Sequence, residues 1–179
     1  RKMQVVFQDP FGSFNPRHKV ARLITEPFHL LETPPTQEER QRLINQTLTA
    51  VGLDPSDANK YIHQFSGGQR QRIAIARALI IQPDLIVFDE AVSALDVSVR
   101  AQILDLLANL SAKYNLTYLF ISHDLSVVRT ITDRVLVMQR GEIVEQGETE
   151  QVFTAPNHPY TQELIAAAPV LPDLQHLKG

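Results

Sequence analysis

The stretch Phe65-Ser66-Gly67-Gly68-Gln69-Arg70-Gln71-Arg72 decides how the rest of the sequence is interpreted. It leads into residues 69–80, which read as a helix. The two glycines leave bare backbone N–H groups at the helix N-terminus, where the peptide dipoles favour an anion. Because Gly67 and Gly68 lack Cβ atoms, a phosphate can approach the main chain closely, and Ser66 adds a hydroxyl donor. The stretch predicts a phosphate-binding site, although most Ser-Gly-Gly tripeptides, taken alone, are turns followed by an N-cap.

Two carboxylates follow a short apolar run. The run Leu85-Ile86-Val87-Phe88 ends directly in Asp89 and Glu90. A short apolar run after a helix is typical of a strand that is buried on both faces of a parallel sheet. The carboxyl ends of such strands are where α/β sheets place their ligands. Asp89 therefore suits a Mg²⁺ shell, and Glu90 suits a general base that activates water.

Three further segments place polar side chains beside these elements. Residues 3–7 read as a strand that delivers Gln8 to its end, and Ser93-Ala94-Leu95-Asp96 comes soon after the carboxylates. The apolar residues 118–121 predict another strand, which ends in Ser122-His123-Asp124. Taken alone, Gln8 is better interpreted as a solvated strand end. Its position among the other motifs favours a functional role.

Together these motifs resemble the nucleotide-binding domain of ATP-binding cassette (ABC) proteins. In order along the chain they are similar to the Q-loop glutamine (Gln8), the signature motif with Phe in place of the usual Leu (65–69), the Walker B strand with its catalytic glutamate (85–90), the D-loop (93–96) and the switch histidine (His123). Five motifs in the family's order are very specific. The resemblance covers essentially the whole chain.

The resemblance implies an α/β fold: a partial P-loop NTPase core with a largely parallel sheet, a helical subdomain and a short C-terminal extension. It divides the chain into four parts, which are the Q-loop strand and the start of the Q-loop (1–12), the helical signature subdomain (13–68), the RecA-like core (69–147) and the extension (148–179). This division is an expectation about domain organisation.

The resemblance also implies the chemistry of the site, which acts on ATP with Mg²⁺. Glu90, His123 and Gln8 are expected to be catalytic. Asp89 and Gln8 are expected to reach the metal ion. The residues expected to contact nucleotide across the interface are Ser66, Gly67, Gly68, Gln69 and Asp96.

The expected partners follow from the same family. A second ABC ATPase domain pairs head to tail with the first, transmembrane permease subunits are driven by it, and an extracytoplasmic solute-binding protein acts indirectly. The expected location is peripheral, at the cytoplasmic face of the inner or plasma membrane. The tail, with residues 147–153 and His158-Pro159-Tyr160-Thr161, resembles ATPase subunits of oligopeptide, dipeptide and nickel importers, as does the stretch 90–98. Taken alone, His-Pro-Tyr is an ordinary turn, and this interpretation is preferred to the alternative that His158 is a metal ligand.

Composition limits the other classes. The 179 residues carry a net charge of −3, 44% hydrophobic residues and no cysteine, which excludes disulfides and gives no electrostatic sign of nucleic-acid binding. No apolar run approaches the roughly 20 residues that span a bilayer. Two rival functions remain open: a soluble ABC protein of translation or DNA repair, and a non-catalytic subunit that donates only a signature motif.

A P-loop of the form Gly-x-x-x-x-Gly-Lys-Ser/Thr does not occur among these residues, since none of the seven glycines precedes a lysine. In the family the P-loop lies upstream of the Q-loop, and the first residue here is Arg1. We therefore expect a longer natural polypeptide. We also expect the 179-residue chain alone to hydrolyse no ATP and to self-associate through uncovered strand edges and apolar surface.

Periodicity predicts the remaining elements. A helical stripe covers residues 19–31, with Pro27 bending or ending it, and Thr36-Gln37-Glu38-Glu39 is a capping box that starts the next helix. A stripe from Val99 to Leu110 predicts a crossover helix between two parallel strands. A tight turn at Arg140-Gly141 predicts an antiparallel hairpin from strand 134–139 into residues 142–145.

Overall fold

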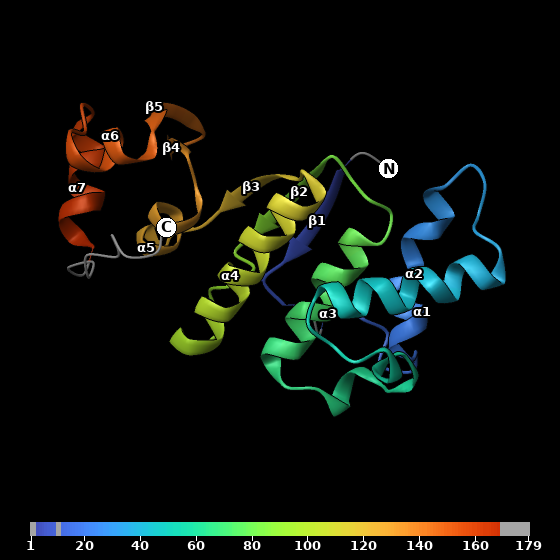
Figure 1. The fold of residues 1–179 in the computed structure, drawn as a ribbon. Coiled ribbons are helices and arrows are strands. Elements are labelled where there is room, and N and C mark those ends of the chain that lie inside the picture. Colours follow the sequence, from blue (N-terminus) through green and yellow to red (C-terminus); the bar gives the residue numbers. More distant parts are fainter. Residues whose placement is uncertain (1–2, 10–11, 169–179) are drawn as a thin grey trace. The chain divides into compact units, whose positions relative to one another are not determined.

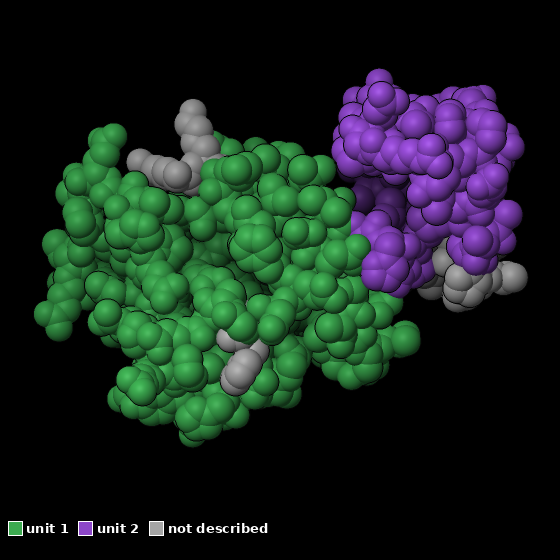
Figure 2. Space-filling view, turned by 180° about the vertical axis from the view of Figure 1, so that it is seen from behind, with its two compact units in different colours: residues 1–121 green, residues 122–179 purple. Residues whose placement is uncertain are grey.

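The computed structural model describes residues 3–9 and 12–168, and these form two compact units, residues 1–121 and 122–179 (Figure 2). Residues 10–11 of the expected start of the Q-loop and residues 169–179 of the expected extension lie outside the described residues.

Three parallel strands form the sheet of the first unit. They are β1 (Met3–Phe7), β2 (Leu85–Asp89) and β3 (Thr117–Ile121), in the order β1-β2-β3 (Figure 1). Phe7 pairs with Asp89, and Asp89 pairs with Ile121, so the three strands end level with one another. The predicted α/β fold with a parallel sheet is confirmed, and residues that directly follow β1 and β2 meet at one edge.

The two faces of this sheet differ. One face carries the buried side chains Val6, Ile86 and Phe88, and Phe88 stacks on Phe120 with ring centroids 4.7 Å apart. The opposite face leaves large apolar side chains exposed, namely Met3, Phe7, Leu119 and Ile121. Side chains alternate between the faces of a strand, so a single register explains both observations.

Helix α4 (Val97–Tyr114) connects β2 to β3 as the predicted crossover. It ends at Asn115, whose backbone is left-handed with φ 52°. The Tyr118 hydroxyl on β3 donates to the carbonyl of Leu107 at 2.9 Å and so joins the strand to the helix. Burial raises the pKa of this phenol.

A helical region lies between β1 and β2. It contains α1 (Val20–Ile24), η1 (Glu26–Leu30), α2 (Gln37–Ala50), η2 (Pro55–Asn59), η3 (Ile62–Gln64) and α3 (Gly67–Leu79), where η marks a 3₁₀ helix. The expected helical stripe over 19–31 is split into α1 and η1, and Pro27 lies in the first turn of η1. The capping box at Thr36 is confirmed, because the Thr36 hydroxyl accepts from Glu39 N–H and the Glu39 carboxylate accepts from Thr36 N–H.

The second unit contains α5 (Leu125–Ile131), β4 (Arg134–Gln139), β5 (Glu142–Glu148), α6 (Thr149–Thr154) and α7 (Pro159–Ala167). β4 and β5 form the predicted antiparallel hairpin, with β5 extending beyond residue 145 to Glu148. Arg140 and Gly141 both have positive φ, 53° and 86°. This is the backbone that a tight two-residue hairpin turn requires.

Candidate functional site

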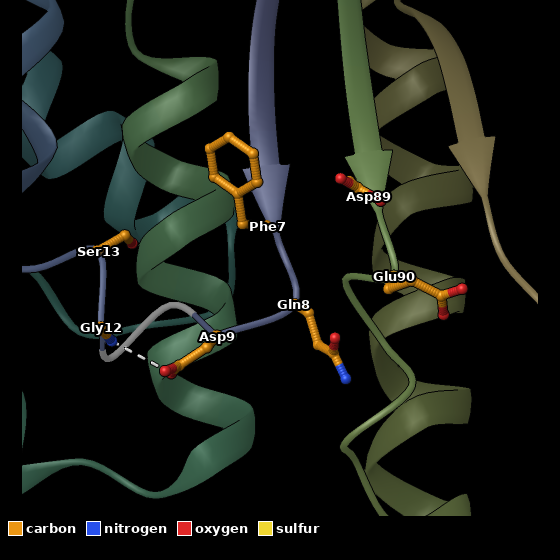
Figure 3. Close-up of a pocket in the computed structure, with 7 residues that line it drawn as sticks. All are labelled: Phe7, Gln8, Asp9, Gly12, Ser13, Asp89 and Glu90. Atoms are coloured by element: carbon orange, nitrogen blue, oxygen red, sulfur yellow. Dashed lines mark hydrogen bonds between the residues drawn. The ribbon is translucent and has the colours of Figure 1, made fainter.

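Three of the predicted site residues meet where β1 and β2 end. Gln8 directly follows β1, Asp89 is the last residue of β2, and Glu90 comes next. The parallel register brings these positions to the same edge of the sheet. They line an open hollow of about 410 Å³ together with Phe7, Asp9, Gly12 and Ser13 (Figure 3). We call this the sheet-end hollow.

Glu90 has an unusual backbone. Its φ is 52°, in the left-handed region that residues other than Gly, Asn and Asp rarely adopt. Its N–H donates to the carbonyl of Ile121 at 2.9 Å, which prolongs the pairing of β2 with β3 by one residue. In Figure 3 the side chains of Asp89 and Glu90 point to opposite sides of the chain. The turn thus gives two adjacent carboxylates different directions.

The sheet-end hollow suits a magnesium ion that is also held by phosphate. Among the described residues, no three His, Cys, Asp or Glu side chains cluster as a metal site. Mg²⁺ is commonly bound through one or two carboxylates, with water and substrate phosphates completing its shell. Within the same part of the chain, neither the Gln8 side chain nor the Asp89 carboxylate makes a hydrogen bond or ion pair. The donor set therefore fits such an ion.

The signature stretch forms the start of α3. The helix begins at Gly67, two residues before the predicted start, because Ser66 is its N-cap. The Ser66 hydroxyl accepts from Gln69 N–H at 3.4 Å, and the Gln69 side chain accepts from Ser66 N–H at 3.0 Å. A hydroxyl can accept one hydrogen bond and donate another. Capping is thus compatible with the predicted contact of Ser66 with phosphate.

The two glycines of this stretch have different surroundings. A Cβ atom added to Gly68 would lie 2.5 Å from Val99 Cγ1 on α4, so the helices pack too closely there for a side chain. A Cβ atom added to Gly67 would meet nothing within 4 Å. Packing within the described residues explains Gly68. The open space at Gly67 is what close approach of a ligand requires.

Asp96 lies at the start of α4. It is the N-cap of that helix, and its Oδ1 accepts from Val99 N–H at 2.9 Å and from the Ser98 hydroxyl at 3.0 Å. The hydrogen bond from Val99 N–H lowers the pKa of the Asp96 carboxyl, and the Ser98 hydroxyl adds to the effect. Since Gly68 abuts Val99, the starts of α3 and α4 are adjacent. The structure thus brings Asp96 close to the signature stretch.

His123 lies in the second unit, between β3 and α5, and its side chain is exposed. The next residue, Asp124, caps α5 by accepting from Ser126 N–H at 2.9 Å. The local backbone around the predicted switch histidine is therefore fixed by a helix cap.

Three arginines of α3 have roles that the sequence interpretation missed. Arg70 donates to the carbonyl of Ile62 and Arg72 to that of Val51, at 3.2 and 2.7 Å. Arg77 reaches the loop that follows β1. Each anchors a different neighbouring segment to α3. The only sequence signal for this is the repeated placement of arginine on an otherwise buried helix.

This geometry can be compared with known proteins. The family model described as ABC transporter matches residues 1–93, slightly more than half of the 179 residues. The chain belongs to the ABC transporter family. A second model, described as the C-terminal region of oligopeptide/dipeptide transporters, matches residues 144–179 of this ABC chain.

Relatives agree with both matches. The dipeptide transport ATP-binding protein DppF of Escherichia coli (strain K12) is 52% identical over 171 residues, which are 96% of this chain and 51% of DppF. The oligopeptide transport ATP-binding protein OppF of Bacillus subtilis (strain 168) is 49% identical over 173 residues, 97% of this chain and 56% of OppF. The chain thus spans about half the length of the curated relatives it matches.

A solved ABC structure has the same fold. The structure of cbiO1 from Clostridium perfringens, part of the ABC transporter complex cbiONQ, matches with a TM-score of 0.76 and 27% identity. The match covers 86% of this chain and 60% of that one. These comparisons confirm the resemblance to ABC ATPases of the peptide-importer type. Within residues 3–9 and 12–168 no helix is long and apolar enough to cross a bilayer.

The tail motif of this ABC chain has a structural basis. The Glu145 carboxylate on β5 accepts from Asn157 N–H at 2.8 Å and from His158 N–H at 3.0 Å. His158 in turn caps α7, its Nδ1 accepting from Tyr160 N–H at 3.1 Å, and Pro159 occupies the first turn. His-Pro-Tyr is therefore a helix start that is held against the hairpin.

Proposed function

We propose that the complete gene product is the ATP-binding and ATP-hydrolysing subunit of an ABC importer, which powers uptake of peptides or similar small solutes through a membrane permease. One observation carries the proposal: Gln8, Asp89 and Glu90 line a single hollow at the carboxyl end of a parallel sheet. This is the edge at which α/β sheets bind their ligands.

The chemistry at the sheet-end hollow is hydrolysis of the γ-phosphate of ATP. Glu90 acts as the general base that polarises the attacking water. Asp89 and Gln8 are the residues that would hold Mg²⁺. When bound, Mg²⁺ neutralises charge that develops on the phosphate oxygens. Gln8 also orients the water, and His123 contacts the γ-phosphate.

The start of α3 contributes to the binding of a second nucleotide. In a head-to-tail pair of ABC domains, Ser66, Gly67, Gly68 and Gln69 bind the γ-phosphate held by the partner domain, and Asp96 crosses the interface. The exposed N–H groups and the helix dipole favour an anion there. Hydrogen bonds to charged groups contribute about 1.5–3 kcal/mol each. Several of them keep the pair closed only while the γ-phosphate is present.

The partners follow from this cycle. Closure and reopening of the pair drive transmembrane permease subunits at the cytoplasmic face of the membrane, where this subunit is peripheral. An extracytoplasmic solute-binding protein supplies the solute. The names of DppF and OppF and the match to the oligopeptide/dipeptide C-terminal region support peptides as the solute class. They also disfavour the two alternative hypotheses, that the protein is a soluble non-transport ATPase or a non-catalytic subunit.

Three expectations from the sequence stay predictions. They are the four-part division at residues 12, 68 and 147, the lack of ATP hydrolysis by the 179-residue chain alone, and its self-association. The exposed apolar face that includes Leu119 and Ile121 supports the last of these.

Uptake measurements test the proposal. The complete gene product is assembled with its permease in membrane vesicles, and entry of labelled di- and oligopeptides is followed with and without ATP. We expect uptake only with ATP and Mg²⁺. ATP hydrolysis without uptake of any peptide would remove the peptide assignment, and absence of hydrolysis would remove the ATPase assignment.

A further inference from the structure

Arg77, near the C-terminal end of α3, contacts the loop that follows β1. Its Nη1 donates to the carbonyl of Ser13 at 3.3 Å, and its Nη2 donates to the Ser13 hydroxyl at 3.1 Å. The planar guanidinium thus contacts the backbone and the side chain of one residue at once. A fork of N–H donors makes such a two-point contact directional.

Two more groups surround the same guanidinium. It lies over the ring of Phe14, 4.5 Å from the ring centroid, and Nη1 is 3.5 Å from Glu26 Oε2 on η1. Phe14 is buried and the Arg77 side chain is 17% exposed. Burial lowers the pKa of Arg77, and Glu26 opposes that shift. A cation that is partly withdrawn from water interacts more strongly with an aromatic face.

The loop that Arg77 contacts belongs to the sheet-end hollow. Ser13 and Gly12 line it together with Gln8. Gly12 N–H donates to Asp9 Oδ1 at 3.1 Å, so a hydrogen bond joins residue 12 to residue 9 (Figure 3). Ser13 is the chain neighbour of Gly12 and Gln8 is the chain neighbour of Asp9, so this hydrogen bond links the position of Ser13 to that of Gln8.

Helix α3 contains both the predicted phosphate-binding residues, at its N-terminus, and Arg77, near its C-terminus. It runs for 13 residues from the Ser66 cap to Leu79, with Arg77 in its last turn. A helix is a rigid element. The two hydrogen bonds from Arg77 to Ser13 therefore hold the loop at a fixed place relative to the N-terminus of α3.

We propose that Arg77 is a positioning residue that holds the loop at residues 12–15, and with it Gln8, at a fixed place relative to the phosphate-binding N-terminus of α3. The inference rests on the proposed ATPase function. In this proposal Arg77 does not contact nucleotide. Its role is to couple the signature helix to the Q-loop of the same chain.

The test uses the complete gene product with Arg77→Met, which keeps the aliphatic stem and removes the guanidinium. We expect hydrogen exchange across residues 12–18 to rise about tenfold, as for loss of one hydrogen bond to a charged group, while α3 keeps its protection. We expect kcat for ATP hydrolysis to fall about tenfold to hundredfold with KM for ATP unchanged, because misplacement of a catalytic group acts on the transition state. Arg77→Lys, which keeps the charge without the fork, restores part of kcat.

Arg72→Met is the matched control. Arg72 is on the same helix and donates to the carbonyl of Val51, away from the loop. This variant loses stability but leaves kcat and exchange at residues 12–18 unchanged. Unchanged exchange in Arg77→Met, or equal loss of kcat in both variants, overturns the inference. If the wild-type protein hydrolyses no ATP, the proposed function fails, and the exchange measurement alone decides whether Arg77 holds the loop.

Discussion

The sheet-end hollow and the starts of α3 and α4 use their polar residues differently. Among the described residues, the side chains of Gln8 and Asp89 make no hydrogen bond or ion pair. At the helix starts, Ser66 and Gln69 cap each other's backbone, and Asp96 caps α4. Residues predicted to bind nucleotide at the helix starts therefore also stabilise the fold.

The difference determines how mutants at each place are interpreted. A loss of activity at the sheet-end hollow reports on chemistry if the side chain makes no structural contact. A loss at the helix starts mixes ligand contact with helix stability, because removing an N-cap alone destabilises a helix. Stability must therefore be measured together with activity.

The largest effect is expected for Glu90→Gln in the complete gene product. We expect ATP binding to persist and hydrolysis to slow by about 10²–10⁴, the range for loss of a general base. The substitution keeps the shape of the Glu90 side chain, so we expect the variant to remain folded. Steady-state ATPase assays and calorimetry measure the two quantities, with Glu38→Gln on the exposed side of α2 as the control. Full activity in Glu90→Gln would exclude this role.

The glycine pair gives the next largest effect. Gly68→Ala places a Cβ atom 2.5 Å from Val99 Cγ1, and overpacking of this kind costs about 1–3 kcal/mol. Gly67→Ala meets no atom and leaves stability unchanged or slightly higher, while ATPase activity falls because phosphate approach is blocked. Thermal unfolding and ATPase assays of both variants test this.

A double mutant identifies the cause of the Gly68 effect. Val99→Ala removes the atom that the new Cβ meets, so Gly68→Ala with Val99→Ala regains stability. A loss of stability in Gly67→Ala, equal to that in Gly68→Ala, would contradict the distinction between the two positions.

A smaller effect is expected for Ser66→Ala, and Thr36→Ala is its matched control. Both residues form capping boxes, so each variant loses about 1 kcal/mol of stability. Only Ser66 is predicted to contact phosphate. We therefore expect only Ser66→Ala to raise the ATP concentration that gives half-maximal hydrolysis. Urea unfolding and ATP titration separate these outcomes. Equal ATP dependence in both variants would reduce Ser66 to a helix cap.

The order of elements and the motif positions could be predicted from sequence because their signals are local. The apolar run 85–88 identifies β2, and the Thr36 capping box identifies the start of α2. Helical segments separate each pair of consecutive strands, which predicts parallel strands. Parallel pairing of β1 with β2 then places Gln8 and Asp89 at the same edge. Pattern and chain direction are enough for these features.

Contacts between distant segments could not be predicted in this way. Arg77 and Ser13 are 64 positions apart, and nothing in either local pattern identifies the other. The steric role of Gly68 depends on Val99 of another helix. Glu90 combines a left-handed backbone with a hydrogen bond to Ile121, a residue of another strand. Each of these features is a property of packing that periodicity does not encode.

The smallest effect concerns pH and the Asp96 cap. Hydrogen bonds from Val99 N–H and the Ser98 hydroxyl lower the pKa of Asp96 in the folded state. The unfolded chain therefore binds the proton at higher pH, so the contribution to stability is present above about pH 4 and is lost as the pH falls through the lowered folded pKa. Asp96→Asn keeps a capping side chain without the charge. We expect the difference in unfolding free energy between wild type and Asp96→Asn to shrink between pH 5 and pH 2 (roughly, from the reference carboxyl pKa). Urea unfolding across this range measures it, and a difference that stays constant with pH would show that the carboxylate charge does not stabilise the start of α4.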